Sequence, residues 1–370
     1  MASAQASRGN EAQQQQEQVY EDVDSFQARS AEGHPDFLLC PLSVEELANA
    51  GIKMADITKL KDASIATVGA VLATPTKASM LWIEYRDQRT LLAIRGFSEA
   101  TVAKIQVAAA KVDTSGSSGM FQTGLQCRQA RQKQLHTGAK QLDALLGGGI
   151  ETGSITEFFG EFRSGKTQLM HTLCVTSQLS KESGGAEGRV VYMDTEGNFR
   201  PERVEAIAER FGLDPTETLE NVIVTRVFNH EQQIERAHGI AALCLTEGPI
   251  RVIIVDSVIA LFRVDFSGRG DLSVRQQKLG KHLSSLLQMA ADLNVAVVLV
   301  NQCMSDPGAM AMFATVKPVG GHVLAHASTT RVHLKKGRGD ERIAKLFDSP
   351  SMPEAECSFK ITNGGITDTD

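Results

Sequence analysis

The sequence has few of the features that hold secreted or zinc-dependent domains together. Its six cysteines are scattered over 370 residues, and no two of them form a C-x-x-C pair. Neither a zinc site nor a disulfide framework is therefore indicated. No apolar run is long enough to cross a bilayer, and the first residues lack the apolar core of a signal peptide. We expect a soluble intracellular protein that does not have a membrane as a partner.

An excess of positive charge is also missing. Lysine and arginine number 38 against 44 aspartates and glutamates, which gives a formal net charge of −6. A nucleic acid could then bind only through local basic patches. The apolar content of 42% and the charged content of 22% are those of an ordinary globular protein, and the length allows more than one domain.

Composition divides the chain into four parts. Residues 1–24 are polar and Gln-rich, which predicts a disordered tail. Residues 25–112 contain short amphipathic segments and predict a small helical domain. Residues 113–134 begin with "DTSGSSG" and predict a flexible linker. In residues 135–370, runs rich in Val and Ile alternate with helical periodicity to the C-terminus, which predicts an α/β core around a mostly parallel sheet.

Individual elements of this core can be assigned from periodicity. The predicted strands are residues 154–159, 189–194, 221–227, 251–256 and 295–302. The predicted helices are residues 166–179, 201–212 and 275–293.

The most specific motif is a phosphate-binding loop. "GEFRSGKT", from Gly160 to Thr167, matches G-x-x-x-x-G-K-[ST] at every fixed position and lies between a predicted strand and a predicted helix. In such loops the glycines let backbone N–H groups point at phosphate oxygens, the lysine reaches the β- and γ-phosphates, and the hydroxyl binds Mg²⁺. A chance glycine-rich turn with an exposed Lys166 is the alternative, and both flanks argue against it.

Two carboxylates follow predicted strands. Asp256 ends "RVIIVD", where it could hold the hydration shell of the metal opposite Thr167. Glu196 in "MDTEGNF" lies just past another strand end, where it could activate the water that attacks the γ-phosphate. Each alone could be an ordinary strand-ending or helix-starting acid. Together with the loop they indicate nucleotide hydrolysis.

Two segments predicted to leave the same edge of the sheet combine basic residues with glycine. Arginines there suit phosphate contacts, and apolar residues could wedge between bases. For any single residue, an ordinary solvated or mobile loop is the alternative. The first segment carries Arg263, Arg269, Arg275 and Lys278, and the second carries Met304, Pro307, Gly308 and Phe313.

In the helical domain, "LLAIRGFSEATVAKI" resembles a helix-hairpin-helix, a motif whose helix N-termini contact DNA phosphates. Gly96 would form its turn. A C-capping Gly96 followed by Ser98 as an N-cap is an equally good interpretation. The segment 80–90, which holds the only tryptophan, is an extension inside this motif to which we assign no structure.

Several segments together resemble the RecA-type strand-exchange recombinases of eukaryotes, from about residue 42 to the C-terminus. They are "GEFRSGKTQ", "MDTEGNFRPER", "ALFRVDFSGRGDLS", "VGGHVLAHASTTR" and "KKGRGDERIAKLFDSPSMPEAE". "RQQKL" and "DPGA" are more similar to the meiosis-specific recombinase than to its general-purpose paralogue, whereas the glycine of "DTEGN" is more similar to the paralogue.

This resemblance implies a RecA-type P-loop ATPase core preceded by a helix-hairpin-helix domain. It implies an enzyme that forms a helical filament on single-stranded DNA with ATP and Mg²⁺, searches double-stranded DNA and exchanges strands in meiotic recombination and double-strand break repair. Stimulation by Ca²⁺, recombination mediator proteins as partners and a location in the nucleus are further expectations.

The resemblance also assigns roles to residues at matching positions. Glu196, Lys166 and Gln302 would be catalytic, Thr167 and Asp256 would hold the metal, and Gln302 and His326 would report the γ-phosphate to the DNA loops. Residues implied to contact the nucleotide are Gly160, Glu161, Phe162, Arg163, Ser164, Gly165, Lys166, Thr167, Gln168, Arg203, which would stack on the adenine, and His326, with Asp348 and Pro353 contributed by the neighbouring protomer. Residues implied to contact DNA are Arg263, Arg269, Arg275, Pro307 and Gly308.

The linker departs from the family pattern. The family's F-x-x-A motif inserts its Phe and Ala into the adjacent protomer, and here the matching residues are "FQTG", so that Gly124 replaces the alanine after Phe121. Loss of one buried methyl group costs roughly 0.8 kcal/mol, and glycine adds linker entropy. We expect filament assembly that is weaker but not abolished.

Other functions stay open at this point. One is the general (mitotic) recombinase, another is a ring-forming RecA-fold motor, and a third is a regulatory paralogue that binds ATP without exchanging strands. The N-terminal domain and the "FQTG" segment favour an open filament over a ring. Intact Lys166, Glu196 and Asp256 argue against a regulatory paralogue. A metabolic P-loop kinase is the weakest alternative, because no lid or acceptor pocket is apparent.

Overall fold

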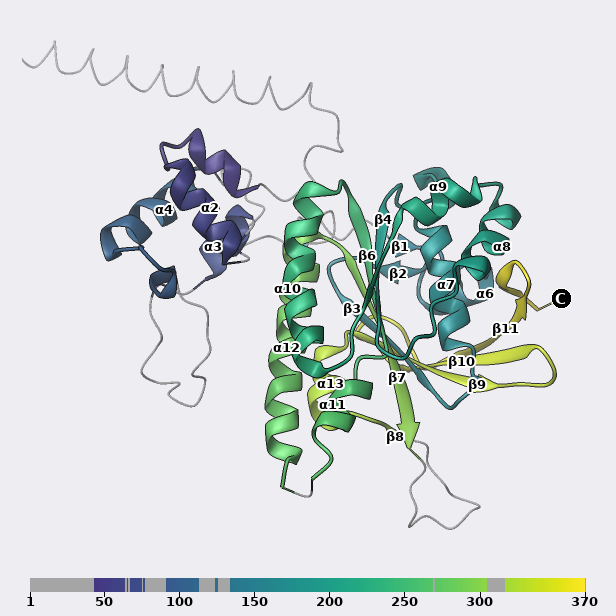
Figure 1. Ribbon diagram of the computed structural model, residues 1–370. Coiled ribbons are helices and arrows are strands. Elements are labelled where there is room, and N and C mark those ends of the chain that lie inside the picture. The colour runs from purple at the N-terminus through teal and green to yellow at the C-terminus, as the bar shows by residue number, and fades with distance from the viewer. Residues whose placement is uncertain are drawn as a thin grey trace, which may run out of the picture. The chain divides into compact units, whose positions relative to one another are not determined.

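The structure is a computed structural model, shown in Figure 1. It describes residues 43–63, 65, 67–74, 76, 91–112, 124–125, 134–268, 270–304 and 317–369. The predicted tail 1–24 and the extension 80–90 lie outside the described residues, as do Phe121, Arg269, Pro307, Gly308 and Phe313.

Residues 43–112 form short helices around a hydrophobic core of their own. The elements are the 3₁₀ helices η2 (Val44–Ala48) and η4 (Leu91–Ala93) and the α-helices α2 (Met54–Asp62), α3 (Val68–Ala73) and α4 (Glu99–Val112). Leu47, Leu60 and Val102 are fully buried in this core. The predicted boundaries of the domain, at residues 25 and 112, stay predictions.

The turn of the predicted hairpin has the local geometry that its residues favour. Gly96 has a φ of 89°, a left-handed conformation that favours glycine. The Ser98 hydroxyl accepts a hydrogen bond of 3.2 Å from the backbone N–H of Thr101, in the first turn of α4. The element before the turn is the short 3₁₀ helix η4 rather than an α-helix. A contact of this turn with DNA stays a prediction.

The core contains a ten-stranded sheet. Its parallel part contains the five strands that the sequence predicts. Strands β9, β3, β7, β6, β4 and β5 are neighbours in that order and run parallel. Each of the five predicted strands occurs with its ends shifted by at most two residues. The bounds are β3 (Ile155–Gly160), β4 (Arg189–Asp194), β5 (Val222–Arg226), β6 (Ile250–Asp256), β7 (Ala296–Met304) and β9 (Thr330–Lys336).

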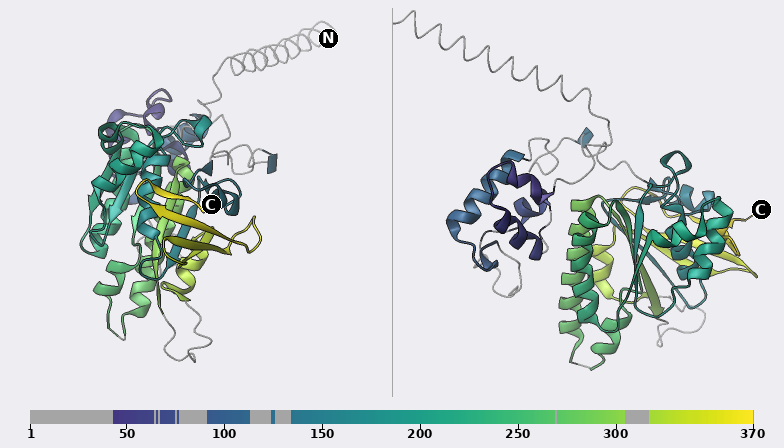
Figure 2. Two further views of the ribbon diagram at one scale, coloured as in Figure 1. Left: turned by 90° about the vertical axis from the view of Figure 1, so that its right-hand side faces the viewer. Right: turned by 45° about the horizontal axis from the view of Figure 1, so that its top comes forward.

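The C-terminal region differs from the prediction, because strands and helices do not alternate to the end of the chain. After β9, the strands β10 (Glu341–Asp348), β11 (Glu356–Thr362) and β12 (Gly365–Asp368) pair antiparallel in sequence order. Thr362 pairs with Gly365, so Asn363 and Gly364 form a two-residue turn. Asn-Gly is a strong hairpin signal, which the expectation of alternating elements overlooked. Figure 2 shows this hairpin region in yellow.

Smaller strands complete the core. β8 (Lys317–Pro318) pairs with the end of β7, and β1 (Gln134–Leu135) pairs with β2 (Ile150–Glu151) as a separate ribbon.

Helices cover the two faces of the sheet (Figures 1 and 2). On one face lie α6 (Lys140–Leu145), α7 (Lys166–Thr176), α8 (Pro201–Phe211) and α9 (Pro215–Glu220), and on the other lie α10 (His230–Thr246), α11 (Ala260–Asp265), α12 (Leu272–Leu293) and α13 (Gly321–Ala327). In the ranges that the structure describes, no helix is both long and apolar enough to span a membrane.

Each face has its own hydrophobic core, which follows from the alternation of side chains along a strand. Tyr192 of β4 and Ile254 of β6 pack in the core that contains residues of α7 and α8. Their neighbours Met193 and Val255 pack in the opposite core, with residues of α10 and α12. Because all of these strand residues are buried, the strands appear in the sequence as continuous apolar runs.

Candidate nucleotide-binding site

Strand register brings the predicted site residues to one edge of the sheet. Asp194 at the end of β4 is paired with Asp256 at the end of β6. Gly160 at the end of β3 is paired with Gln302 in β7. Because these strands are parallel, the loops that follow their C-terminal ends converge.

The phosphate-binding loop connects β3 to α7 with the backbone geometry that its glycines predict. A Cβ atom at Gly160 would collide with the carbonyl oxygen of Leu334, so the close approach of β9 excludes any larger residue. Gly165, before the first residue of α7, has a φ of 97°, which favours glycine. Arg163 also has a positive φ, of 63°, while Phe162 is 87% exposed. A Cβ atom at Gly165 would also collide with Ile361, so the turn before α7 requires glycine for its space as well as for its φ.

The side chain of Lys166 folds back onto the phosphate-binding loop. Its Nζ donates to the carbonyl oxygens of Gly160 (2.9 Å) and Glu161 (2.8 Å) and reaches the Ser164 hydroxyl at 3.3 Å. Burial lowers the pKa of Lys166, and the negative charge of Asp256 opposes that change. The ammonium group is thus partly desolvated and hydrogen-bonded to neutral acceptors.

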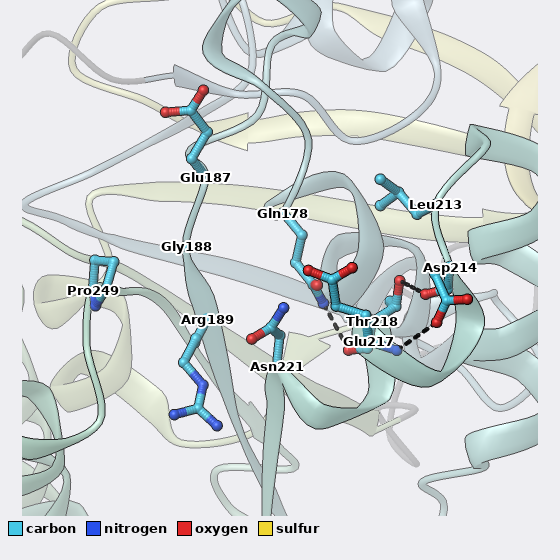
Figure 3. Close-up of a pocket in the computed structure, with 10 residues that line it drawn as sticks. All are labelled: Gln178, Glu187, Gly188, Arg189, Leu213, Asp214, Glu217, Thr218, Asn221 and Pro249. Atoms are coloured by element: carbon cyan, nitrogen blue, oxygen red, sulfur yellow. Dashed lines mark hydrogen bonds between the residues drawn. The ribbon is translucent and has the colours of Figure 1, made fainter.

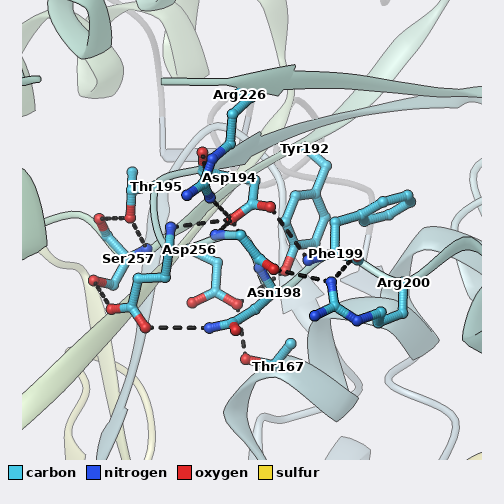
Figure 4. Close-up of polar contacts among 12 residues, drawn as sticks. Thr167, Tyr192, Asp194, Thr195, Asn198, Phe199, Arg200, Arg226, Asp256 and Ser257 are labelled. Carbon is cyan, nitrogen blue, oxygen red and sulfur yellow. Dashed lines mark hydrogen bonds and ion pairs between the residues drawn. The ribbon is translucent and has the colours of Figure 1, made fainter. Parts of the chain in front are cut away.

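Asp256 connects β6 to the loop. Its Oδ2 accepts hydrogen bonds of 2.9 Å from the Thr167 hydroxyl and of 2.9 Å from the Tyr192 hydroxyl (Figure 4). The side chain is almost completely buried, and this burial raises the pKa of Asp256 to about 6 although both hydrogen bonds act to lower it. The two predicted metal ligands, Thr167 and Asp256, are therefore in direct contact.

Glu196 is oriented by three donors from three different segments. Its Oε1 accepts from the Ser257 hydroxyl at 2.8 Å and from the Gln302 amide at 2.7 Å. Its Oε2 accepts from the Asn198 amide at 3.2 Å. The predicted catalytic carboxylate and the predicted reporter Gln302 are thus brought together, and Ser257 and Asn198 are partners that sequence reasoning missed.

Asp194 is a further residue that the sequence analysis did not single out. Its Oδ1 accepts the backbone N–H groups of Glu196 (3.1 Å), Gly197 (2.6 Å) and Asn198 (3.2 Å), and its Oδ2 accepts that of Phe199 at 3.3 Å (Figure 4). The buried carboxylate holds the whole turn that carries Glu196. The signal was present in "DTEGN", because Asp commonly accepts from backbone N–H groups two residues on, and Gly and Asn favour turns.

A guanidinium group balances this buried carboxylate. Arg226 NH1 lies 2.9 Å from Asp194 Oδ1, so the carboxylate has a charged partner as well as its backbone donors. Arg226 is the last residue of β5, one strand further along the sheet.

Arg203 and Gln168 are also brought together. Arg203 in α8 donates to Gln168 Oε1 in α7 at 3.1 and 2.9 Å, and to the carbonyl oxygens of Thr362 and Asn363 at 2.9 and 2.8 Å. Its guanidinium plane is fixed at the junction of α7, α8 and the β11–β12 turn. Stacking of this plane on an adenine stays a prediction.

Three other predicted nucleotide contacts are exposed. His326 in α13 stacks on His322, with a distance of 6.1 Å between ring centroids. Asp348, at the end of β10, and Pro353, in the segment before β11, are exposed on the surface. Contacts of Asp348 and Pro353 with a neighbouring protomer stay predictions.

One predicted DNA contact is linked to this site. Arg263, in α11, donates from NH1 to Gln302 Oε1 at 3.4 Å, while the amide nitrogen of the same Gln302 donates to Glu196. Arg275 lies in the first turn of α12 and donates its backbone N–H to the Asp271 carbonyl. Gln302 therefore bridges the candidate catalytic carboxylate and the first predicted DNA-binding segment.

A cavity of about 370 Å³ lies elsewhere, at the N-terminal ends of β4, β5 and β6 (Figure 3). Its lining includes Arg189, Asp214, Glu217 and Asn221, and none of the predicted site residues. The candidate site is thus defined by converging polar groups at the opposite edge of the sheet, not by this cavity.

Comparison with known proteins agrees with the family resemblance of the sequence motifs. Residues 128–369 match the Rad51 family. The chain belongs to the Rad51 family. It is 52% identical over 334 residues to the meiotic recombination protein DLH1 of Candida albicans, covering 89% of this chain and 98% of that protein. It is 54% identical over 331 residues to the meiotic recombination protein DMC1 of Saccharomyces cerevisiae, covering 89% and 95%.

A plant relative extends the comparison. Over 353 residues the chain is 47% identical to the meiotic recombination protein DMC1 homolog B of Oryza sativa subsp. japonica, covering 94% of this chain and 97% of that protein. The resemblance to eukaryotic strand-exchange recombinases, with the meiosis-specific member as the nearer of the two, is confirmed, as is the RecA-type α/β core. Proteins of this family are DNA-dependent ATPases.

Proposed function

We propose that the chain is a meiotic DNA recombinase. It forms a filament on single-stranded DNA with ATP and Mg²⁺ bound, and pairs that strand with homologous double-stranded DNA. One observation carries the mechanism: an unbroken line of contacts runs from Glu196 through Gln302 to Arg263, from the site of hydrolysis to the first DNA-binding segment.

The residues present fit ATP and Mg²⁺. Thr167 and Asp256 offer oxygen ligands, which Mg²⁺ prefers, and the buried carboxylate with its raised pKa gains a counter-charge from a cation. Bound Mg²⁺ would neutralise phosphate charge. Lys166, held by neutral carbonyl groups, would gain a stronger partner in an anionic phosphate oxygen.

Glu196 would act as the general base for the attacking water. Oε1 already accepts two hydrogen bonds, whereas Oε2 accepts one, from the exposed end of Asn198. Oε2 is therefore the oxygen with capacity to accept a proton. Asp194, which holds the turn, would act as a positioning residue, since it contacts the backbone of Glu196 rather than its carboxylate.

Gln302 would couple nucleotide state to DNA affinity. Its amide nitrogen and its amide oxygen point to different partners, so one side-chain rotation changes the contacts of both Glu196 and Arg263. A change at the γ-phosphate that moves Glu196 would thus alter how Arg263 is held. Coupling between the nucleotide and DNA needs a group that can take up two arrangements, and we assign this role to the Gln302 side chain.

The wider role follows from this activity. A recombinase of meiosis works in the nucleus, and mediator proteins and Ca²⁺ would promote its filament. A general recombinase remains the second candidate, favoured by the glycine of "DTEGN". The ring-forming motor and the regulatory paralogue receive less support, because the hydrolytic residues are intact and connected to a DNA segment.

The decisive experiment measures DNA-stimulated ATP hydrolysis and D-loop formation for wild type and for Gln302→Ala. We expect wild type to show both activities, and Gln302→Ala to bind ATP normally while it loses the stimulation by DNA. The matched control is Gln178→Ala, because Gln178 donates to backbone carbonyl groups at the other edge of the sheet, 2.8 Å from Cys174 and 3.0 Å from Thr218. A wild-type chain that hydrolyses ATP but makes no D-loops would instead favour the regulatory paralogue.

A further inference from the structure

His230, the first residue of α10, joins three helices. Its backbone N–H and its ring Nδ1 both lie within hydrogen-bond distance of Asp265 Oδ2, at 2.8 and 2.6 Å. Its Nε2 lies 2.9 Å from Lys278 Nζ. Asp265 is the last residue of α11, and Lys278 lies in the second turn of α12.

The aromatic surroundings keep this ring in place. Its centroid is 4.7 Å from that of Phe266, edge-on, and 5.6 Å from that of Phe262. Lys278 Nζ lies 5.1 Å from the centroid of Phe266. Only 7% of the His230 surface is exposed. A ring packed this way cannot reorient without disturbing both neighbouring helices.

The partners determine where the ring carries its proton. A carboxylate only accepts and an ammonium group only donates, so Nδ1–H donates to Asp265 and Nε2 accepts from Lys278. Burial alone would raise the pKa of Asp265, but the hydrogen bonds from His230 hold it below its ordinary value. The ring thus links Asp265 on α11 to Lys278 on α12.

These contacts lie at both ends of the first predicted DNA-binding segment. The connection from α11 to α12 runs from residue 266 to residue 271, and Arg263 and Arg275 flank it. Asp265 directly precedes the connection, and Lys278 follows Arg275 by three residues, on the same side of α12 by helical spacing. A contact that links Asp265 and Lys278 through one ring therefore constrains the two ends of this connection.

We propose that His230 is a positioning residue for this DNA-binding segment, which it holds in shape by bridging Asp265 and Lys278. The inference rests on the proposed function only for the statement that the segment contacts DNA. Without the bridge, Lys278 loses its acceptor on the ring, and the Asp265 carboxylate keeps its hydrogen bond from the backbone N–H of residue 230. The segment then samples wider arrangements, and binding of single-stranded DNA carries the cost of ordering it again.

The same pair of helices supplies a control. His238 of α10 contacts Ser285 of α12 at 3.4 Å, well along both helices from the DNA-binding segment. A substitution there disturbs the packing of α10 on α12 without touching Asp265 or Lys278. The variants to compare are His230→Leu, which keeps bulk but not polarity, His230→Gln, whose amide oxygen can accept from Lys278, and His238→Leu.

The test measures amide hydrogen exchange over residues 266–271 in the full chain without DNA or nucleotide, and then the affinity for single-stranded DNA. We expect exchange to be about tenfold faster in His230→Leu, the effect of losing a hydrogen bond to a charged group, and to be restored in His230→Gln. DNA affinity should fall roughly tenfold or less in His230→Leu, the range for residues that do not touch the ligand.

The outcomes separate this inference from the proposed function. Exchange that is unchanged in His230→Leu, or raised equally in His238→Leu, overturns the inference even if the protein exchanges strands. Faster exchange with rescue by glutamine supports it even if wild type fails to bind single-stranded DNA, which would overturn the proposed function alone. As a second variant, Lys278→Met should also raise exchange. The double variant should be no faster than His230→Leu, because His230→Leu already removes the contact with Lys278.

Discussion

The two edges of the parallel sheet carry charged residues in different ways. At the C-terminal edge, Asp194 and Asp256 are buried and accept hydrogen bonds from at least two segments each. At the N-terminal edge, next to the cavity of about 370 Å³, Arg189 and Glu247 pair at 2.9 Å with side chains 25% and 47% exposed. Both edges have charges, but the carboxylates of Asp194 and Asp256 are removed from water, whereas the Arg189–Glu247 pair stays partly solvated.

The burial of its carboxylates distinguishes the candidate site from the other edge of the sheet. Burying a carboxylate is costly unless donors surround it, so a network such as that of Asp194 persists where orientation is needed. A solvated ion pair beside an open cavity has little such cost and fixes little. Convergence of buried polar groups, rather than hollow volume, distinguishes the candidate nucleotide site in this fold.

Removing the ammonium group of the phosphate-binding loop should give the largest effect at the C-terminal edge. We expect Lys166→Ala to abolish ATP binding and D-loop formation, because the variant loses the ammonium group that the loop holds beside Gly160 and Glu161 and that would bind the phosphates. Fluorescent-nucleotide binding and a D-loop assay measure this. Strand exchange retained by Lys166→Ala would show that the comparison of the two edges has misplaced the site.

The turn that carries Glu196 provides the next test. In Asp194→Asn, an amide NH₂ would face the Phe199 N–H and Arg226 would lose its anionic partner. The misplaced glutamate should lower kcat for ATP hydrolysis about 100-fold while nucleotide affinity changes little.

A carboxylate of the N-terminal edge provides the matched control for that variant. Asp214 also accepts a backbone N–H, that of Glu217 at 2.8 Å, but as the N-cap of α9 beside the cavity. Because asparagine is as good an N-cap as aspartate, Asp214→Asn should leave kcat unchanged. Equal losses of kcat in the two variants would remove the distinction between the edges.

The parts of this architecture differ in how well the sequence predicts them. Strands such as residues 251–256 are predictable because burial on both faces leaves a continuous apolar run. The phosphate-binding loop is predictable because its chemistry needs glycines at fixed positions.

The hydrogen-bond partners in the site are not predictable in this way. Ser257 lies 61 residues from Glu196, and Arg226 lies 32 residues from Asp194, so each pair meets only through strand register. The antiparallel strands β10 and β11 are only half buried, so their apolar residues do not form a continuous run. The expectation that strands and helices alternate was therefore extended to this region by mistake.

Acid should weaken the C-terminal edge through His171. Burial first, and then the charges of Arg203 and Arg200, lower the pKa of His171 from 6.5 to about 4, while its Nε2 accepts the Arg200 backbone N–H. The unfolded chain therefore binds this proton more readily than the folded chain. The free energy of unfolding should fall as the pH drops from about 6.5 towards 4, by about 3 kcal/mol at most from this residue.

Urea denaturation at several pH values measures this slope. His171→Gln, which keeps an acceptor but cannot gain a proton, should show a shallower decrease than wild type. A slope that His171→Gln leaves unchanged would mean that the buried ring does not contribute to acid instability.

The smallest effect is expected at the N-terminal edge. Glu247→Gln removes the charge that pairs with Arg189, but Arg189 keeps its hydrogen bonds to the carbonyl oxygens of Glu247 and Glu220, at 2.8 and 2.9 Å. The free energy of unfolding should fall by about 1 kcal/mol or less, as for other solvated ion pairs, and less still at high salt. ATPase activity should stay at the wild-type rate. A clear loss of activity from this exposed pair, measured beside Asp194→Asn, would show that the edge next to the cavity also takes part in function and that burial alone does not mark the site.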